Sequence, residues 1–241
     1  MTSAPNAAAA ASSSIVNPPV VVFFTDNGKG LGHVTRMLAV ARRARGRFRP
    51  YFLTLSLGYQ ILRGQGIPAE FFPPYHHLGL TKGEWSPLLM ERLAEVIAGT
   101  EARAVVVDHV TPPKTFGELR RQLSGVEMIW SRRGLWKPGT NRGAIDLEDA
   151  FDQVVEPGDL AAPIDIGSST SNRTGIRSIE PVILLDPSGA MPRQEARRLL
   201  GLPDTGRALL LNLSAPDTAS LVAMLEKVRD VARAVSKGEQ I

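Results

Sequence analysis

The chain has 241 residues, of which 43% are hydrophobic and 22% are charged, a balance typical of a globular protein with a sizeable core. Its 28 basic and 24 acidic residues leave a formal net charge of +4, which is too small to indicate a nucleic-acid-binding protein. The absence of cysteine excludes disulfides, thiol nucleophiles, and zinc or iron–sulfur sites built on cysteine. No apolar run in the sequence approaches the roughly 18 residues that a membrane span requires.

The N-terminal segment, residues 1–17, is rich in Ala and Ser. It lacks the basic start and the strongly apolar centre of a secretion signal. We therefore expect a disordered leader over 1–17 and a cytoplasmic protein.

Strand-sized apolar runs alternate with helical patterns along most of the chain. The expected strands are residues 19–25, 51–55, 67–72, 104–107 and 126–131, with a weaker one at 153–155. The expected helices are one that begins near residue 33, a short one that ends near 64–66, and two longer ones over 86–98 and 115–123. Ser86 is the expected N-cap of the third helix, and residues 157–178 are expected to form a loop. Strands separated by helices predict an α/β fold, a doubly wound parallel sheet that forms the domain over 18–180.

The last part of the chain departs from this alternation. Strand-like runs at 181–185 and 207–213 flank a helix over 193–200, and an amphipathic helix follows the second run. A buried parallel strand needs strands on both edges and helices on both faces, which a single helix cannot supply. We therefore expect a linker and an incomplete second Rossmann-like unit over 181–241. The alternative is that the last strand extends the first sheet.

The candidate functional residues follow the expected strands, because ligands of open α/β sheets bind at the carboxyl ends of the strands. All four histidines of the chain are among them. These candidates are Asn27, Gly28, Gly30, Gly32, His33, His76, His77, Asp108, His109, Ser131, Arg132 and Arg133.

The segment from Gly28 to His33 reads GKGLGH and precedes a helix. Its glycines allow backbone N–H groups to approach a ligand, and the helix N-terminus favours negative charge there. The spacing matches neither the dinucleotide-binding fingerprint nor the P-loop. The alternative is a plain glycine-rich turn.

His33 is the main candidate for acid–base chemistry. In the first turn of a helix its protonated form is disfavoured, so the neutral ring can accept a proton from a sugar hydroxyl near pH 7. Asp108 would orient such a base or bind a hydroxyl group, or it would cap the following turn. Arg132 and Arg133 are expected either to bind phosphate or to form a solvated pair.

Two further possibilities depend on residue clusters. The spacing of the other three histidines and Asp108 does not demand a metal site, and we expect none. A basic stretch in and after the first helix would attract anionic lipids if its members shared one face, although most such runs are solvated. It contains Arg36, Arg42, Arg43, Arg45, Arg47 and Arg49. Residues 85–90 would add an apolar contact with the membrane, but a core-facing stripe is the favoured interpretation.

Several segments together resemble the N-terminal half of GT-B glycosyltransferases, most closely those of the MurG-like type. They are VVVFFTDNGKGLGHVTRMLAVARR, GIPAEFFP, AVVVDHV, EMIWSRRGLW and the linker-like EPVILLDPSGAMPRQEARRLLGLPDTGRALLLNLS. The resemblance covers about 19–240. It implies transfer of a hexose or N-acetylhexosamine from a nucleotide-sugar to a lipid-linked or glycan acceptor. It also implies inverting chemistry with neither a metal nor another cofactor, the nucleotide-sugar being a co-substrate.

The resemblance gives roles to individual residues. His33 and Asp108 are expected to be catalytic. The expected substrate-binding residues are Asn27, Gly28, Gly30, Gly32, Arg36, His109 and Arg133. The donor domain of such enzymes corresponds to positions beyond Ile241, so a longer protein or a partner chain is expected to supply it, with peripheral contact at the inner face of the membrane. The alternatives are a non-catalytic module that binds an acceptor or partner, and a sugar-nucleotide epimerase of the same architecture.

Overall fold

The computed structural model describes residues 17–26, 31–44, 46–170, 174–206, 208 and 217–236. Three predictions fall on residues outside these ranges: the leader (except residue 17), the loop residues Asn27, Gly28 and Gly30, and the strand at 207–213 (except residue 208). The chain divides into two units, Met1–Asp186 and Pro187–Ile241.

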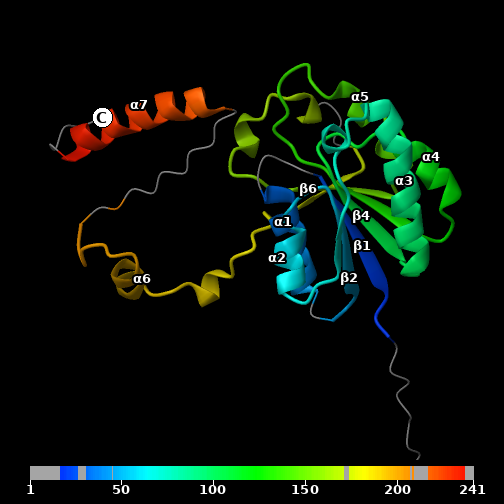
Figure 1. Cartoon of the computed structure of the whole chain (residues 1–241), viewed down its shortest axis with the longest axis horizontal. Coiled ribbons are helices and arrows are strands. Elements are labelled where there is room, and N and C mark those ends of the chain that lie inside the picture. Colours follow the sequence, from blue (N-terminus) through cyan, green and yellow to red (C-terminus); the bar gives the residue numbers. More distant parts are fainter. Residues whose placement is uncertain are drawn as a thin grey trace, which may run out of the picture. The chain divides into compact units, whose positions relative to one another are not determined.

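The first unit is built on a parallel sheet of seven strands, with helices on both faces (Figure 1). The strands are β1 (Val20–Thr25), β2 (Arg49–Thr54), β3 (Ala69–Phe71), β4 (Ala104–Asp108), β5 (Glu127–Ser131), β6 (Gln153–Pro157) and β7 (Ile176–Ile179). They lie in the order β3-β2-β1-β4-β5-β6-β7. The order reverses between β1 and β4, so a crevice for a ligand is expected where these two strands end. The predicted doubly wound α/β fold is confirmed.

Two helical layers cover the sheet. The helices of this unit are α1 (Gly32–Arg43), α2 (Tyr59–Gly64), α3 (Lys82–Gly99), α4 (Phe116–Gln122) and α5 (Arg142–Ile145). Successive side chains of a strand point to opposite faces. Accordingly, Val22 and Phe24 of β1 belong to the apolar core under α3 and α4, whereas Phe23 packs with α1 and α2. Single 3₁₀ turns occur at Tyr75–His77, Glu148–Ala150, Ala162–Ile164 and Ser168–Thr170.

The start of α3 differs from the prediction. The helix begins at Lys82 rather than at residue 86, and Ser86 is not its N-cap. Thr81 and Glu84 form a capping box in which each side chain accepts a hydrogen bond from the other residue's backbone N–H. Ser86 followed by Pro87 looks like a helix start, but the capping box that begins five residues earlier, at Thr81, satisfies the first free N–H groups.

The segment after β6 also differs from the prediction. Residues 176–178, expected in a loop, belong to β7, which pairs in parallel with β6. Residues 181–185, expected as a strand, form none. There the backbone carbonyl of Ile183 accepts a hydrogen bond from Arg43, and Leu184 packs against the core under α1. Apolar side chains in this run are therefore partly buried without strand pairing.

The segment that was considered for membrane contact faces the core. Trp85, Leu89 and Met90 of α3 are buried, and Leu88 alone among these four apolar side chains is exposed. The core-facing stripe is therefore confirmed. Within the part of the chain that the structure describes, no helix is long and apolar enough to cross a bilayer.

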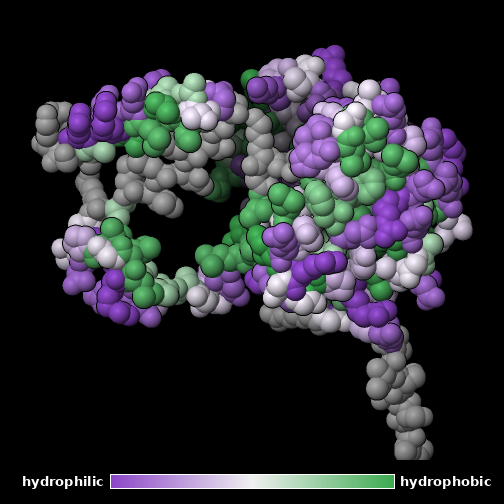
Figure 2. All heavy atoms as spheres, viewed as in Figure 1, coloured by the Kyte–Doolittle hydropathy of each residue, from purple (hydrophilic) through white to green (hydrophobic). Residues whose placement is uncertain are grey.

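The second unit contains the 3₁₀ turn Pro187–Gly189 and the helices α6 (Arg193–Leu199) and α7 (Thr218–Ser236). Both predicted helices are confirmed. Hydrophobic and hydrophilic side chains lie next to one another on α7 (Figure 2), and its exposed apolar residues include Leu221, Leu225 and Val231. The incomplete second Rossmann-like unit stays a prediction, because its strand falls almost entirely outside the described residues.

Candidate functional site

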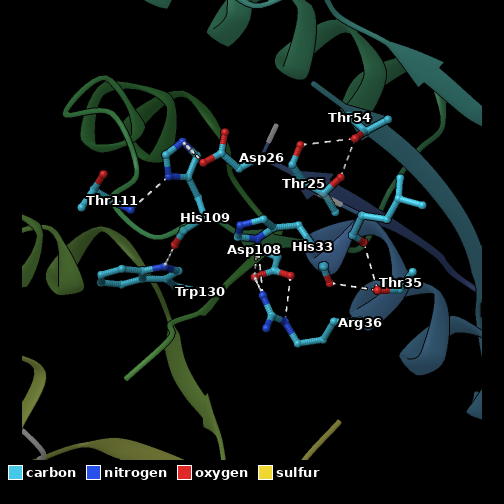
Figure 3. Close-up of polar contacts among 12 residues, drawn as sticks. Thr25, Asp26, His33, Thr35, Arg36, Thr54, Asp108, His109, Thr111 and Trp130 are labelled. Carbon is cyan, nitrogen blue, oxygen red and sulfur yellow. Dashed lines mark hydrogen bonds and ion pairs between the residues drawn. The ribbon is translucent and has the colours of Figure 1, made fainter. Parts of the chain in front are cut away.

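Three side chains meet where β1 and β4 end. Asp108 is the last residue of β4, and His33 and Arg36 lie in the first two turns of α1, which follows β1 (Figure 3). His33 Nδ1 is 3.2 Å from Asp108 Oδ1. Arg36 donates from Nε to Oδ2 at 3.0 Å and from Nη2 to Oδ1 at 2.8 Å. The Asp108 carboxylate is fully buried, and the His33 side chain is 8% exposed. The structure thus brings together both predicted catalytic residues.

The contacts of His33 Nδ1 indicate its tautomer. Asp108 Oδ1 accepts hydrogen bonds only and is the closer neighbour of this nitrogen, because Arg36 Nη2 lies at 3.4 Å. A bare Nδ1 would place its lone pair against the carboxylate, so the proton belongs on Nδ1. The neutral ring then has an unprotonated Nε2, which is the atom that can accept a proton from a substrate.

A second histidine, His109, lies beside this group with a different arrangement. Its Nδ1 accepts a hydrogen bond from the Thr111 backbone N–H at 3.0 Å, and its Nε2 is 3.5 Å from Asp26 Oδ2 (Figure 3). Its neutral ring therefore carries the proton on Nε2, toward Asp26. Burial lowers the pKa of His109, and the negative charges of Asp26 and Asp108 oppose the change. His109 is accordingly neutral near pH 7 and has no bare ring nitrogen for use as a base.

A cavity of about 810 Å³ opens at this edge of the sheet. Asp26 and His109 line it, together with His76, Lys82 and Trp85. Its volume lies within the range of pockets that bind small molecules, about 300–1,000 Å³. The cavity therefore offers carboxylate, imidazole and ammonium groups next to aromatic surface.

A second cavity of about 610 Å³ has Arg36 in its lining. Arg36 and the exposed Arg133, both predicted to bind substrate, line it together. Acidic side chains are also present, among them Asp159 and Asp165. The structure thus places two predicted binding residues in one cavity, although Arg36 is already paired with Asp108.

Arg132 is neither a phosphate ligand at the surface nor one of a solvated pair. Its side chain is fully buried and pairs with Glu148 at 2.6 Å and with Glu156 at 2.8 Å. Burial raises the pKa of Glu148, and the charge of Arg132 opposes this change. A buried, doubly paired guanidinium has a structural role, which the sequence did not indicate because both carboxylates follow later in the chain.

The remaining predicted residues are placed as follows. Gly32 is the first residue of α1, and a Cβ atom there would meet nothing within 4 Å. His76 and His77 are exposed, with ring centroids 4.5 Å apart. Among the described residues, no three side chains of the His, Asp and Glu types gather in a group that could hold a metal.

Asp26 is a site residue that the sequence reasoning missed. It follows β1 directly and lines the larger cavity. The signal that pointed to Asp108, an acidic residue at the end of an apolar strand, applies equally to Asp26. Asp26 was missed because the glycine-rich segment that follows it was interpreted as the functional part of this strand end.

Comparisons with known proteins give likenesses among solved structures alone: no family model and no curated protein matches the chain. A glycosyltransferase from Rickettsia africae is similar over 78% of this chain and 50% of its own, with a TM-score of 0.57 and 12% identity. MurG from Acinetobacter baumannii is similar over 59% of this chain and 42% of its own, with a TM-score of 0.45 and 18% identity. A putative UDP-N-acetylglucosamine 2-epimerase from Listeria monocytogenes is similar over 66% and 44%, with a TM-score of 0.46 and 14% identity.

These likenesses concern the fold. The match to the R. africae enzyme shows that the described chain shares the fold of a GT-B glycosyltransferase, as the sequence segments predicted. The chain spans half or less of the length of these three proteins. These likenesses therefore show the fold of this chain and not the activity of the whole protein.

Proposed function

We propose that this chain is the acceptor-side part of a GT-B glycosyltransferase. The enzyme transfers a hexose or N-acetylhexosamine from a nucleotide-sugar to a hydroxyl group of a lipid-linked or glycan acceptor, as a peripheral protein at the inner face of the membrane. The fold hosts several activities, so the site has to carry the argument. The observation that carries it is the contact between His33 and Asp108 where β1 and β4 end.

The proposed reaction uses His33 as the general base. Its Nε2 takes the proton of the acceptor hydroxyl while that oxygen forms a bond to the anomeric carbon of the sugar. The bond from this carbon to the diphosphate oxygen breaks, and the nucleoside diphosphate leaves with the electron pair. Attack opposite the leaving group inverts the anomeric configuration. Asp108 accepts a hydrogen bond from the Nδ1–H of His33, stays ionised and stabilises the imidazolium that forms.

The larger cavity is the proposed acceptor site. Asp26 lines it and accepts hydrogen bonds from hydroxyl groups, as suits a sugar. His109, with its Nε2 proton toward the Asp26 carboxylate, holds that carboxylate in place. Neutral His109 adds no positive charge beside His33, which leaves His33 free to accept a proton.

The diphosphate of the donor is proposed to bind at the start of α1. No described side chain caps this helix terminus, and the N–H groups at the start of a helix favour a negatively charged ligand. The predicted loop residues Asn27, Gly28, Gly30 and Gly32 lead into it. The rest of the donor site is proposed to come from further sequence or from a partner chain.

The test is a transferase assay on the complete protein with nucleotide-sugars and acceptors of each class. His33→Ala is expected to lower kcat by about 10²–10⁴-fold, the contribution of a general base. His77→Ala is the matched control, because His77 is exposed and lies outside the pair. An unchanged rate for His33→Ala would refute the assignment of the base.

The same assay distinguishes the alternatives. Nuclear magnetic resonance of the product is expected to show inverted anomeric configuration, and a retained one would contradict the proposed attack. Acceptor binding without consumption of any nucleotide-sugar would indicate the non-catalytic module. Isomerised nucleotide-sugar in the absence of acceptor would indicate the epimerase.

A further inference from the structure

We propose that Arg36 is a positioning residue that holds the Asp108 carboxylate so that the His33 ring keeps a proton on Nδ1, hydrogen-bonded to this carboxylate. The inference rests on the proposed function, because it concerns the residue proposed as base. It changes the expected role of Arg36 from binding substrate to setting the state of His33.

Arg36 forms a fork with Asp108, in which two N–H groups of one guanidinium bond to the two oxygens of one carboxylate. Arg36 donates to both oxygens of Asp108, at 3.0 Å and 2.8 Å, so the plane of the carboxylate is fixed. The Arg36 side chain is 15% exposed and that of Asp108 is fully buried, so water competes little for these bonds. A carboxylate held in this way cannot rotate Oδ1 away from His33.

Both side chains that contact the Asp108 carboxylate, His33 and Arg36, come from one helix. His33 and Arg36 are three residues apart in α1 and thus neighbours on one helix face. They share Oδ1, which lies 3.2 Å from His33 Nδ1 and 2.8 Å from Arg36 Nη2. Because Arg36 fixes this oxygen, the hydrogen bond from Nδ1 to it is maintained and Nε2 stays bare.

The positive charge of Arg36 also balances the negative charge of Asp108. A buried carboxylate without a cation would favour a protonated imidazole beside it, and such a ring cannot act as a base. Arg36 balances the charge of Asp108, so the ring of His33 faces a pair with no net charge. The other ionisable groups near this place are His109, kept neutral by burial, and Asp26 and Lys82, which act on His109. Arg36 is thus the described cation that contacts the carboxylate next to His33.

The experiment is long-range ¹H–¹⁵N nuclear magnetic resonance of the four histidine rings in this chain at pH 7. His33→Gln assigns the His33 signals. In the wild-type chain His33 is expected to show a neutral ring with a proton on Nδ1 and none on Nε2. In Arg36→Gln we expect these signals to be replaced by those of a doubly protonated ring or of mixed tautomers.

Two further variants separate charge from geometry. Arg36→Lys keeps the charge but not the fork, so we expect a neutral His33 ring with mixed tautomers. Arg42→Gln is the matched control: Arg42 also lies in α1 but bonds to Gln65, away from the site. Should Arg36→Gln not fold, Arg36→Lys carries the test, because it keeps a cation beside the buried Asp108 carboxylate.

Identical His33 signals in the folded Arg36→Gln chain, or in Arg36→Lys where Arg36→Gln does not fold, and in Arg42→Gln would overturn the proposal. This result is independent of turnover, so it is distinguishable from failure of the proposed function, which His33→Ala tests. In the complete enzyme, Arg36→Gln is expected to lower kcat at unchanged KM, since it removes part of the 10²–10⁴-fold contribution of a base.

Discussion

His109 shows how burial alone restricts the chemistry of a single residue. Its ring stacks on Phe24 with centroids 6.3 Å apart, and both ring nitrogens face polar partners. Burial lowers its pKa below the ordinary value of 6.5. At neutral pH the ring therefore directs its Nε2 proton toward Asp26, whereas His33, where the same two strands end, is the candidate base.

This depressed pKa predicts a pH dependence of stability. As pH falls below about 6.5, the unfolded chain takes up a proton at His109 that the folded chain does not. The free energy of unfolding should therefore fall between pH 7 and 5.5, by up to about 1 kcal/mol from this group. Urea unfolding of the wild-type chain and of His109→Asn at both pH values measures it, and the variant is expected to show a smaller fall. His77→Asn is the control that should keep the wild-type dependence; an equal fall in His109→Asn would contradict the attribution.

Among the elements, α3 shows how a local signal fixes a helix start. Thr81 accepts a hydrogen bond from the Glu84 N–H, and the Glu84 carboxylate accepts one from the Thr81 N–H. The hydrogen bonds that the Glu84 carboxylate accepts from the N–H and the hydroxyl of Thr81 lower the pKa of Glu84. The pattern Thr-x-x-Glu predicts a capping box at Thr81, but the pair Ser86-Pro87 also has the residue types typical of a helix start.

The two possible caps of α3 differ in their expected effect on stability. Thr81→Ala should lower the free energy of unfolding by about 1 kcal/mol, because it removes the N-cap acceptor. Ser86→Ala should change it by less than about 0.5 kcal/mol, because Ser86 lies inside the helix. Denaturant unfolding of both variants measures the difference. A larger loss for Ser86→Ala would contradict the assigned cap.

The strand β7 was missed for a physical reason. It is an edge strand that pairs with β6 alone, and three of its four residues are exposed. Such a strand needs no apolar run, which is the signal that sequence reasoning relies on. Residues 181–185 present the opposite case, because they form an apolar run without strand pairing, of which Leu184 packs against the core.

At the scale of the whole molecule, the proposed function requires more than this chain. The R. africae glycosyltransferase is about twice as long as the portion that this chain spans. We therefore expect the protein isolated from its own cells to have an intact mass well above 26.0 kDa, or to copurify with a partner chain. Mass spectrometry of the native protein measures this. A mass that matches this chain, with no partner present, would contradict the proposed missing donor domain and favour a binding role.

The amino-acid sequence alone predicted the α/β class, six of the seven described strands and the place of the candidate residues at strand ends. It could do so because buried parallel strands are continuous apolar runs and because α1 and α7 show a helical period. It also predicted that His33 and Asp108 share a site, through the rule for strand ends.

The contacts between these residues become visible only in the folded chain. Arg36 and Asp108 are 72 residues apart in the chain, and their fork depends on β1 and β4 being neighbours in the sheet. The tautomers of His33 and His109 and the burial of Arg132 likewise depend on partners from distant elements. Hydrogen bonds and burial are properties of the packed chain, and local sequence carries no record of which distant group will supply the partner.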